Sequence, residues 1–196
     1  MLLDEKVFYT PNGMANADQS HPDFLGEYNH ECLWNGYVWP FTISQTLNAL
    51  KKITKNKDCP QKYKDMYLKL LHQYAELHHR TKSNGETVMW IDECRHPQKD
   101  LWSSREILKN LGWLECKGGY ERGKDYNHST FCDLIISGLV GVRYEDDDLT
   151  VNPCIPEEWE YFKLENLHFR GKTYSVIYDK TGEKYHLGKG IMLQEI

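Results

Sequence analysis

The sequence predicts a mainly α-helical chain followed by a small antiparallel β unit. Apolar residues recur every three or four positions over residues 42–53 and, more clearly, over residues 63–77, which predicts two amphipathic helices. Beyond residue 146, short alternating runs rich in Tyr, Val, Ile and Phe are separated by turn sequences, which predicts paired strands. We therefore divide the 196 residues into a helical part, 1–145, and a β part, 146–196.

The elements of the helical part follow in order. The first 38 residues show neither period and predict a long loop, of a kind that often lines a site. We expect the first helix to start near Thr42 or Ser44, either of which can cap it. Its apolar stripe consists of Ile43, Leu47, Leu50 and Ile53. The second helix carries a longer stripe: Tyr63, Met66, Tyr67, Leu70, Leu71, Tyr74 and Leu77.

Three further segments complete the helical part. The sequence "HHR" from His78 indicates the exposed end of the second helix. "SSREILKNLGW" predicts a short helix with a serine cap and a glycine near its end. "STFCDLIISGLVGVR" predicts a buried helix, and its Gly138 and Gly141 indicate close packing or a terminus. The β part then follows the acidic run "YEDDD", which we interpret as a solvated turn rather than a calcium site.

Composition excludes several classes of function. The chain has 24 Lys and Arg against 29 Asp and Glu and no basic stripe, so nucleic acid is not an expected partner. It has no apolar run of about 18 residues and no secretory leader, so we expect no membrane partner and a cytoplasmic location. Its six cysteines form no CxxC pair, so we interpret them as reduced thiols and expect neither a metal nor a cofactor.

Three loop stretches concentrate polar and aromatic side chains, and each precedes a predicted helix. They are "CLWNGYVWPF", "MWIDECRHP" and "GGYERGKDYNHSTF". If these loops meet at one end, tryptophans would offer stacking surfaces while carboxylates and planar donors would contact hydroxyls, as sugar recognition requires. The side chains concerned are Trp34, Trp39, Trp90, Asp92, Glu93, Glu121, Arg122, Lys124, Asp125, Asn127 and His128.

Simpler interpretations of the same residues remain open at this point. A tryptophan before a helix often belongs to the core, and an Asp-Glu pair such as Asp92-Glu93 is often solvated surface. The sequon "NHS" at Asn127 has no secretory context to support glycosylation. No single stretch therefore identifies a function.

Taken together and in this order, the stretches resemble a known family. "WNGYVWPFTISQTLNAL", "MWIDECRHPQKDLWSSREIL" and "ERGKDYNHSTFCDLIISGLVGV", followed by "LTVNPCIPEEWEYFKLENL", resemble the C-terminal part of inverting glycoside hydrolases with an (α/α)6 toroid. The resemblance is to the mannosylglycerate hydrolase-like group related to glycoside hydrolase family 63 and the trehalases. It implies that residues 1–145 form a partial toroid and that the substrate is an oligosaccharide or glycoside.

The resemblance also implies roles for individual residues. Inverting enzymes use a general acid and a general base about 6.5 to 9.5 Å apart. Glu93 matches the position of the base, and Asp92 is the alternative. Trp34, Asn35 and Trp39 resemble the sugar-contacting stretch of the family, and Trp90 would form a wall of the same pocket. The late loop that borders the site contributes the remaining candidates, Glu121, Lys124, Asp125, Tyr126 and His128.

Two departures from the family pattern limit what the resemblance implies. The turn after the base reads "PQKD" instead of "P-x-T-G", and no segment of this chain resembles the one that carries the general acid. A complete toroid needs roughly 300 residues or more. We therefore expect the base-bearing half of an enzyme, with self-association or an upstream half-toroid as partner. The alternative is a non-catalytic carbohydrate-binding or assembly module.

Overall fold

The computed structural model describes residues 2–26, 33–56, 58–123, 126–145 and 147–196, and it contains helices followed by small antiparallel sheets. The helical elements are α1 (Pro40–Thr54), α2 (Gln61–Glu76), α3 (Ser103–Asn110), η1 (Glu115–Lys117), η2 (Tyr120–Gly123), α4 (His128–Asp133) and η3 (Leu134–Leu139). The strands are β1 (Tyr9–Thr10), β2 (Gly13–Met14), β3 (His79–Thr81), β4 (Thr87–Met89), β5 (Val142–Glu145), β6 (Asp148–Val151), β7 (Tyr161–Phe169), β8 (Lys172–Asp179) and β9 (Gly190–Glu195).

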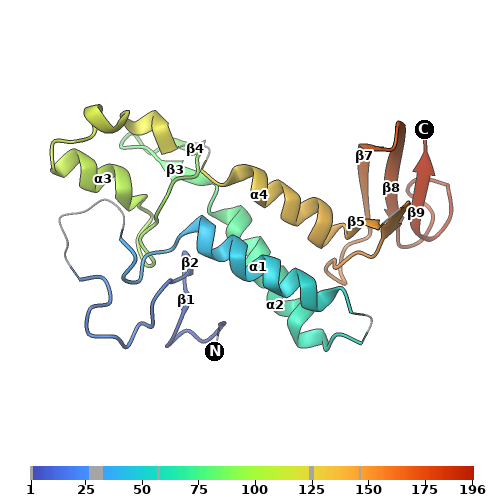
Figure 1. Cartoon of the computed structure of the whole chain (residues 1–196), viewed down its shortest axis with the longest axis horizontal. Coiled ribbons are helices and arrows are strands. Elements are labelled where there is room, and N and C mark those ends of the chain that lie inside the picture. The colour runs from blue at the N-terminus through green and yellow to red at the C-terminus, as the bar shows by residue number, and fades with distance from the viewer. Residues whose placement is uncertain (1, 27–32, 57, 124–125, 146) are drawn as a thin grey trace.

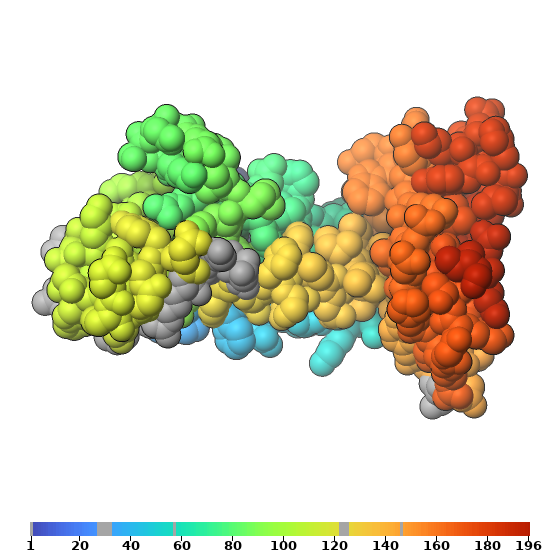
Figure 2. All heavy atoms as spheres, turned by 90° about the horizontal axis from the view of Figure 1, so that it is seen from above, coloured from blue at the N-terminus to red at the C-terminus, as the bar shows by residue number. Residues whose placement is uncertain are grey.

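The molecule is elongated. Figure 1 shows α1, α2 and α4 in the middle, the β5 to β9 region at one end, and α3 with the β3-β4 hairpin at the other. Figure 2 shows that the middle helices form a narrow waist between the two broader ends. No helix in the described ranges is long and apolar enough to cross a membrane.

The first predicted helix is confirmed as α1, but its start and part of its stripe differ from the prediction. Pro40 occupies the first turn, where its fixed φ and missing N–H are tolerated, and Trp39 precedes it without a side-chain cap. Thr42 and Ser44 lie inside the helix and donate to carbonyls in its first turn. Ile53 is 43% exposed, whereas the next residue, Thr54, is buried, so Ile53 lies outside the buried face of α1.

The second predicted helix is confirmed as α2, which packs against α1. Its apolar stripe supplies Tyr67, Leu70, Leu71 and Tyr74 to the largest buried cluster of the described chain. The predicted serine cap of α3 is wrong, because Ser103 is already helical and Trp102 precedes it. The Ser103 hydroxyl is buried and forms no hydrogen bond in the described structure, so it caps no N–H group of the helix.

The last predicted helix is confirmed as α4 continued by the π-helical segment η3, but its predicted burial is wrong for α4, which has no buried residue, while η3 buries Leu134, Gly138 and Leu139. The Tyr67 hydroxyl donates a 2.8 Å hydrogen bond to the carbonyl oxygen of Leu134 in this segment. A Cβ at Gly138 would overlap that hydroxyl, so only glycine allows the approach. Gly141 ends the segment at a φ of +74°, and a Cβ there would overlap the Asn152 carbonyl. Both glycines therefore have the packing roles that the sequence indicates.

The predicted β unit is confirmed, although its first strand begins earlier than expected. β5 and β6 form one hairpin, and β7, β8 and β9 form a three-stranded antiparallel sheet. The predicted division after residue 145 falls in the turn between β5 and β6. The hairpins β1-β2 and β3-β4 were not predicted, because strands of two or three residues are too short to show a period.

Asp179, at the end of β8, holds the following turn together. Its carboxylate accepts backbone N–H bonds from Gly182 at 2.7 Å and from Lys184 and Tyr185 at 2.9 Å each. Burial by itself would raise the pKa of this carboxyl group, but the backbone hydrogen bonds lower it overall. The ionised carboxylate therefore stabilises the fold.

This lowered pKa predicts acid sensitivity. The stabilisation is complete above the pKa of an unfolded aspartate, about 4, and is lost as the pH falls through the lower folded-state value. We expect Asp179→Asn to flatten the fall of the unfolding free energy below about pH 4, measured by urea titration between pH 2 and 6. The exposed Asp58→Asn variant is the control. Identical pH profiles for Asp179→Asn and the unsubstituted chain would contradict the role.

Candidate functional site

The three loop stretches meet in the fold. Val38 and Arg95 exchange backbone hydrogen bonds of 3.0 and 2.9 Å, which fixes the first two stretches side by side. The third stretch joins the first through Asn127, whose amide donates to the Pro40 carbonyl at 3.3 Å. The Tyr126 ring also packs edge-on against Trp39, with centroids 6.3 Å apart. The expected gathering of these stretches is therefore present.

Trp34 and Trp39 form a stacked pair at this meeting point. Their ring centroids are 4.0 Å apart and their planes differ by 11°. Trp34 is 51% exposed, whereas Trp39 is buried and donates its indole N–H to the Leu33 carbonyl at 2.7 Å. The pair therefore presents one open indole face, that of Trp34. Trp39 supports this face from behind instead of offering a second surface, because its own face is covered.

A hollow of about 310 Å³ lies beside Trp34. Its other lining residues are Ala17, His21, Asp23, Phe24 and Asn35. The Asn35 amide donates to the carbonyls of Asp23 and Gly26 at 3.1 Å each, so this side chain fixes the shape of the loop. His21, Asp23 and Phe24 were not predicted, because they lie in an aperiodic loop whose only signal is its polarity.

Asp92 and Glu93 have very different surroundings. Asp92 is fully buried, and its carboxylate accepts hydrogen bonds from Arg105 Nε at 2.9 Å and Nη2 at 3.1 Å. Its Oδ1 also accepts the backbone N–H of Glu93 at 2.7 Å. The Glu93 side chain is 27% exposed, with its carboxylate 3.8 Å from Arg105 Nη2. Of the two carboxylates, only that of Glu93 reaches solvent.

Arg105 is the electrostatic centre of this group. Burial alone would lower the pKa of its guanidinium, but the hydrogen bonds and charge of Asp92, together with the charge of Glu93, raise the pKa overall. The guanidinium therefore remains charged beside the two carboxylates. Sequence reasoning missed Arg105, because its partners lie thirteen and twelve residues earlier, too far apart for a local pattern to reveal.

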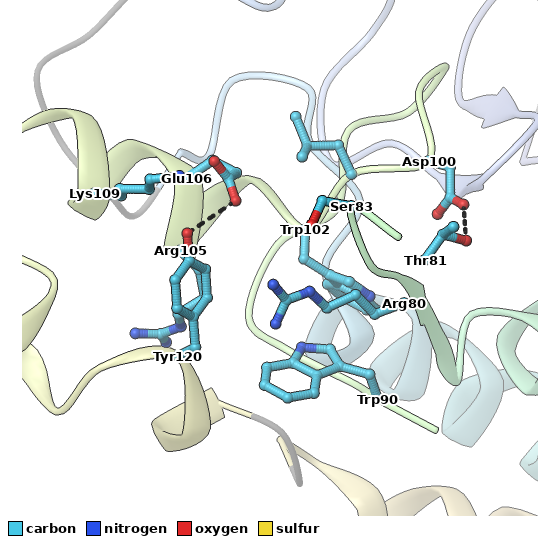
Figure 3. Close-up of a pocket in the computed structure, with 11 residues that line it drawn as sticks. Arg80, Thr81, Ser83, Trp90, Asp100, Trp102, Arg105, Glu106, Lys109 and Tyr120 are labelled. Carbon is cyan, nitrogen blue, oxygen red and sulfur yellow. Dashed lines mark hydrogen bonds between the residues drawn. The ribbon is translucent and has the colours of Figure 1, made fainter. Parts of the chain in front are cut away.

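Trp90 is largely buried, and it lines a cavity between the β3-β4 hairpin and α3. Its exposed fraction is 7%, and the Arg80 guanidinium lies 4.9 Å from its ring centroid. Figure 3 shows the Arg80 side chain reaching over Trp90 towards Tyr120. Because the Arg80 guanidinium covers the indole ring, a ligand here would meet the arginine and not the face of Trp90.

The third stretch is only partly described. Lys124 and Asp125 lie outside the described residues, as does the side chain of Arg122. Glu121 is exposed in η2, and Tyr126 is half-buried against Trp39. His128 is exposed at the start of α4, so a ligand could reach its imidazole.

His78 does not form the exposed helix end that was expected. It is 7% exposed, and its ring packs against Phe131 at a centroid distance of 4.4 Å. Its Nδ1 lies 2.9 Å from the Tyr74 carbonyl oxygen, and burial lowers the pKa of the imidazole. The sequence "HHR" misleads because the chain turns inward after α2 into the β3-β4 hairpin. Across the described residues, no group of three or more His, Cys, Asp or Glu side chains could hold a metal ion.

Comparison with known families identifies the chain as a glycoside hydrolase domain. Residues 1–129 match the mannosylglycerate hydrolase MGH1-like glycoside hydrolase domain, and residues 142–194 match the C-terminal domain of glycosyl hydrolase family 65. Because the first match covers more than half of the sequence, the chain belongs to the MGH1-like glycoside hydrolase family. The resemblance noted in the sequence is thereby confirmed.

A solved structure supports the fold. A protein described as a sialidase is 33% identical to this chain and superposes with a TM-score of 0.76. The alignment covers 99% of this chain and 16% of that protein, so the chain spans a small part of its length. A search of curated proteins found no match.

Proposed function

We propose that the chain carries the general base and part of the sugar site of an inverting glycosidase, with Glu93 as the base. The observation that carries this proposal is the contrast between the two adjacent carboxylates. Glu93 reaches solvent and lies 3.8 Å from Arg105, whereas Asp92 is enclosed and saturated with hydrogen bonds. A base must reach the water that it activates, so the geometry favours Glu93.

The roles of the other residues follow from exposure. The open face of Trp34 would stack on the apolar face of a sugar ring, and the polar side chains of the adjacent hollow would contact its hydroxyls. His128 and Tyr126 would border the same site from the third stretch. The general acid would come from a segment outside this chain, about 6.5 to 9.5 Å from Glu93 across the glycosidic bond.

One observation favours a second function, that of a non-catalytic carbohydrate-binding module. The Trp34-Trp39 pair and its hollow need no carboxylate to bind a sugar. Calorimetry with gluco- and manno-disaccharides measures binding, and a chromogenic glycoside assay measures hydrolysis. Binding without hydrolysis, even in a protein that contains the segment with the general acid, would favour the module over the enzyme.

The sugar platform gives a separate prediction. We expect Trp34→Ala to weaken disaccharide binding about tenfold, because about 1 to 2 kcal/mol of apolar and stacking contact is lost. Titration calorimetry on the purified chain measures the effect. Trp113→Ala is the matched control, since Trp113 is a comparably exposed tryptophan outside the hollow. Equal affinities for Trp34→Ala and Trp113→Ala would remove Trp34 from the site.

A further inference from the structure

A second cavity, of about 330 Å³, lies between the β3-β4 hairpin and α3 (Figure 3). It is separate from the hollow beside Trp34, with which it shares no lining residue. The side chains that matter for its chemistry are Arg80, Trp90, Trp102, Arg105, Lys109 and Tyr120. Its size suits a monosaccharide unit better than a single ion.

Arg80 lines this cavity and forms no ion pair with a carboxylate among the described residues. Its guanidinium lies 4.9 Å from the centroid of Trp90 and 4.7 Å from that of Tyr120. No acidic partner of Arg80 occurs in the described part of the chain. Contacts with aromatic rings use the flat face of a guanidinium and leave its N–H edges free to donate. Arg80 is therefore positioned and charged, with donors available to a ligand.

Two enclosed donors on the same walls also have no acceptor. Trp90 and Arg105 are 7% and 3% exposed, and Trp90 Nε1 and Arg105 Nη1 form no hydrogen bond within the described structure. Buried N–H groups without acceptors are unfavourable and uncommon in folded proteins. Both N–H groups lie within the wall and not on the cavity surface, so the donors that a ligand can reach are the edges of Arg80.

The two acidic side chains that line the cavity both accept hydrogen bonds, and Asp100 is also paired with a cation. Asp100 accepts from Arg95 at 2.6 Å and from the Thr81 hydroxyl at 2.9 Å. Glu106 accepts the Tyr120 hydroxyl at 3.2 Å, and Lys109 adds a second cation at the exposed rim. In the described part of the chain Arg80 and Lys109 form no ion pair, so two cations stand against the single unpaired carboxylate of Glu106, and this balance favours a ligand with negatively charged oxygens.

We propose that this cavity binds an anionic substituent of a glycan, a carboxylate or a sulfate ester, with Arg80 as the principal contact. The aromatic walls and the volume would accommodate the ring that bears the charge. This site goes beyond the proposed hydrolysis, since it requires neither Glu93 nor Trp34. It would make the protein selective for acidic over neutral sugars.

Titration calorimetry on the full chain tests the proposal with glucuronic acid, glucose 6-sulfate, glucose and inorganic sulfate. We expect the two charged sugars to bind and their affinity to fall as salt is raised, while glucose binds at least about tenfold more weakly. Whichever charged sugar binds more tightly identifies the substituent. Equal binding of glucose, or inorganic sulfate binding as tightly as both charged sugars, would overturn the proposal.

Variants assign the binding to this cavity. Arg80→Gln should weaken binding of the charged sugars at least about tenfold, since a charge-assisted hydrogen bond is lost. Lys82→Gln removes the same charge from the turn of the same hairpin, where Lys82 pairs with Glu86, and should leave binding unchanged. If Arg80→Gln unfolds the chain, Lys109→Gln at the rim provides the test and should weaken binding about twofold to threefold.

The outcome of this test is distinguishable from that of the proposed hydrolysis. Binding of the charged sugars should persist in Glu93→Gln and Trp34→Ala, whatever those variants do to turnover and to disaccharide affinity. Unchanged binding in both Arg80→Gln and Lys109→Gln would overturn the assignment to this cavity.

Discussion

Replacing Glu93 by glutamine should lower turnover by at least about 100-fold in a protein that also contains the general acid, while disaccharide affinity changes by less than about threefold. General base catalysis typically contributes about 10² to 10⁴ to the rate, and a glutamine has the shape of glutamate without its basic oxygen. Initial rates with a chromogenic glycoside and calorimetry on the same preparation measure the two quantities. Turnover within threefold of the unsubstituted enzyme would show that Glu93 is not the general base.

Glu86→Gln is the matched control for Glu93. Glu86 is an exposed glutamate of the β3-β4 hairpin, and its only described ion pair is with Lys82. The same chemical change there should leave turnover unaltered, because this carboxylate lies outside the proposed site. Loss of turnover in both variants would point to a general effect of removing charge from this end of the molecule.

Replacing Asp92 by alanine should destabilise the fold by about 3 to 5 kcal/mol. Asp92 is fully buried and accepts two hydrogen bonds from the Arg105 guanidinium, so the substitution leaves this buried cation with the more distant Glu93 carboxylate, 3.8 Å away, as its described counter-ion. Urea unfolding followed by circular dichroism measures the free energy of unfolding. A loss below about 1 kcal/mol would show that Arg105 finds another partner.

The double variant Asp92→Leu with Arg105→Met tests whether the loss of stability comes from the unpaired charge of Arg105 or from the loss of packing at position 92. Apolar side chains of similar volume remove both charges together, so we expect the double variant to recover much of the stability lost in Asp92→Ala. Turnover should stay low in the double variant, because Glu93 loses the cation beside it. A double variant less stable than Asp92→Ala would mean that the site requires the charges to fold.

The helices could be predicted because their core positions repeat along the chain. The α2 stripe, with Tyr67, Leu70 and Tyr74, is a local pattern, and so is the alternation in β7 and β8. The helix starts could not be predicted equally well. At α1, a tryptophan packed against Trp34 precedes a proline in the first turn, so packing and not a capping side chain determines where the helix begins.

The sequence identified the loops that come together in the candidate site, but not which of their side chains are exposed. Polarity and aromatic content identified the stretches, which the Val38–Arg95 and Asn127–Pro40 hydrogen bonds join in the fold. Burial separates Trp34 from Trp39, and Glu93 from Asp92, and burial depends on segments distant in the sequence. The residues that contact Arg80 and Arg105 are also distant in the sequence, so no local motif predicts these contacts.

A crystal structure of the Glu93→Gln variant with a disaccharide tests the central claim most directly, because the variant should bind sugar without cleaving it. Our account predicts a sugar ring stacked on the open face of Trp34 and an ordered water held by the side chain at position 93 on the side of the ring opposite the glycosidic oxygen. A sugar bound away from Trp34, or a position 93 that contacts neither water nor sugar, would contradict it.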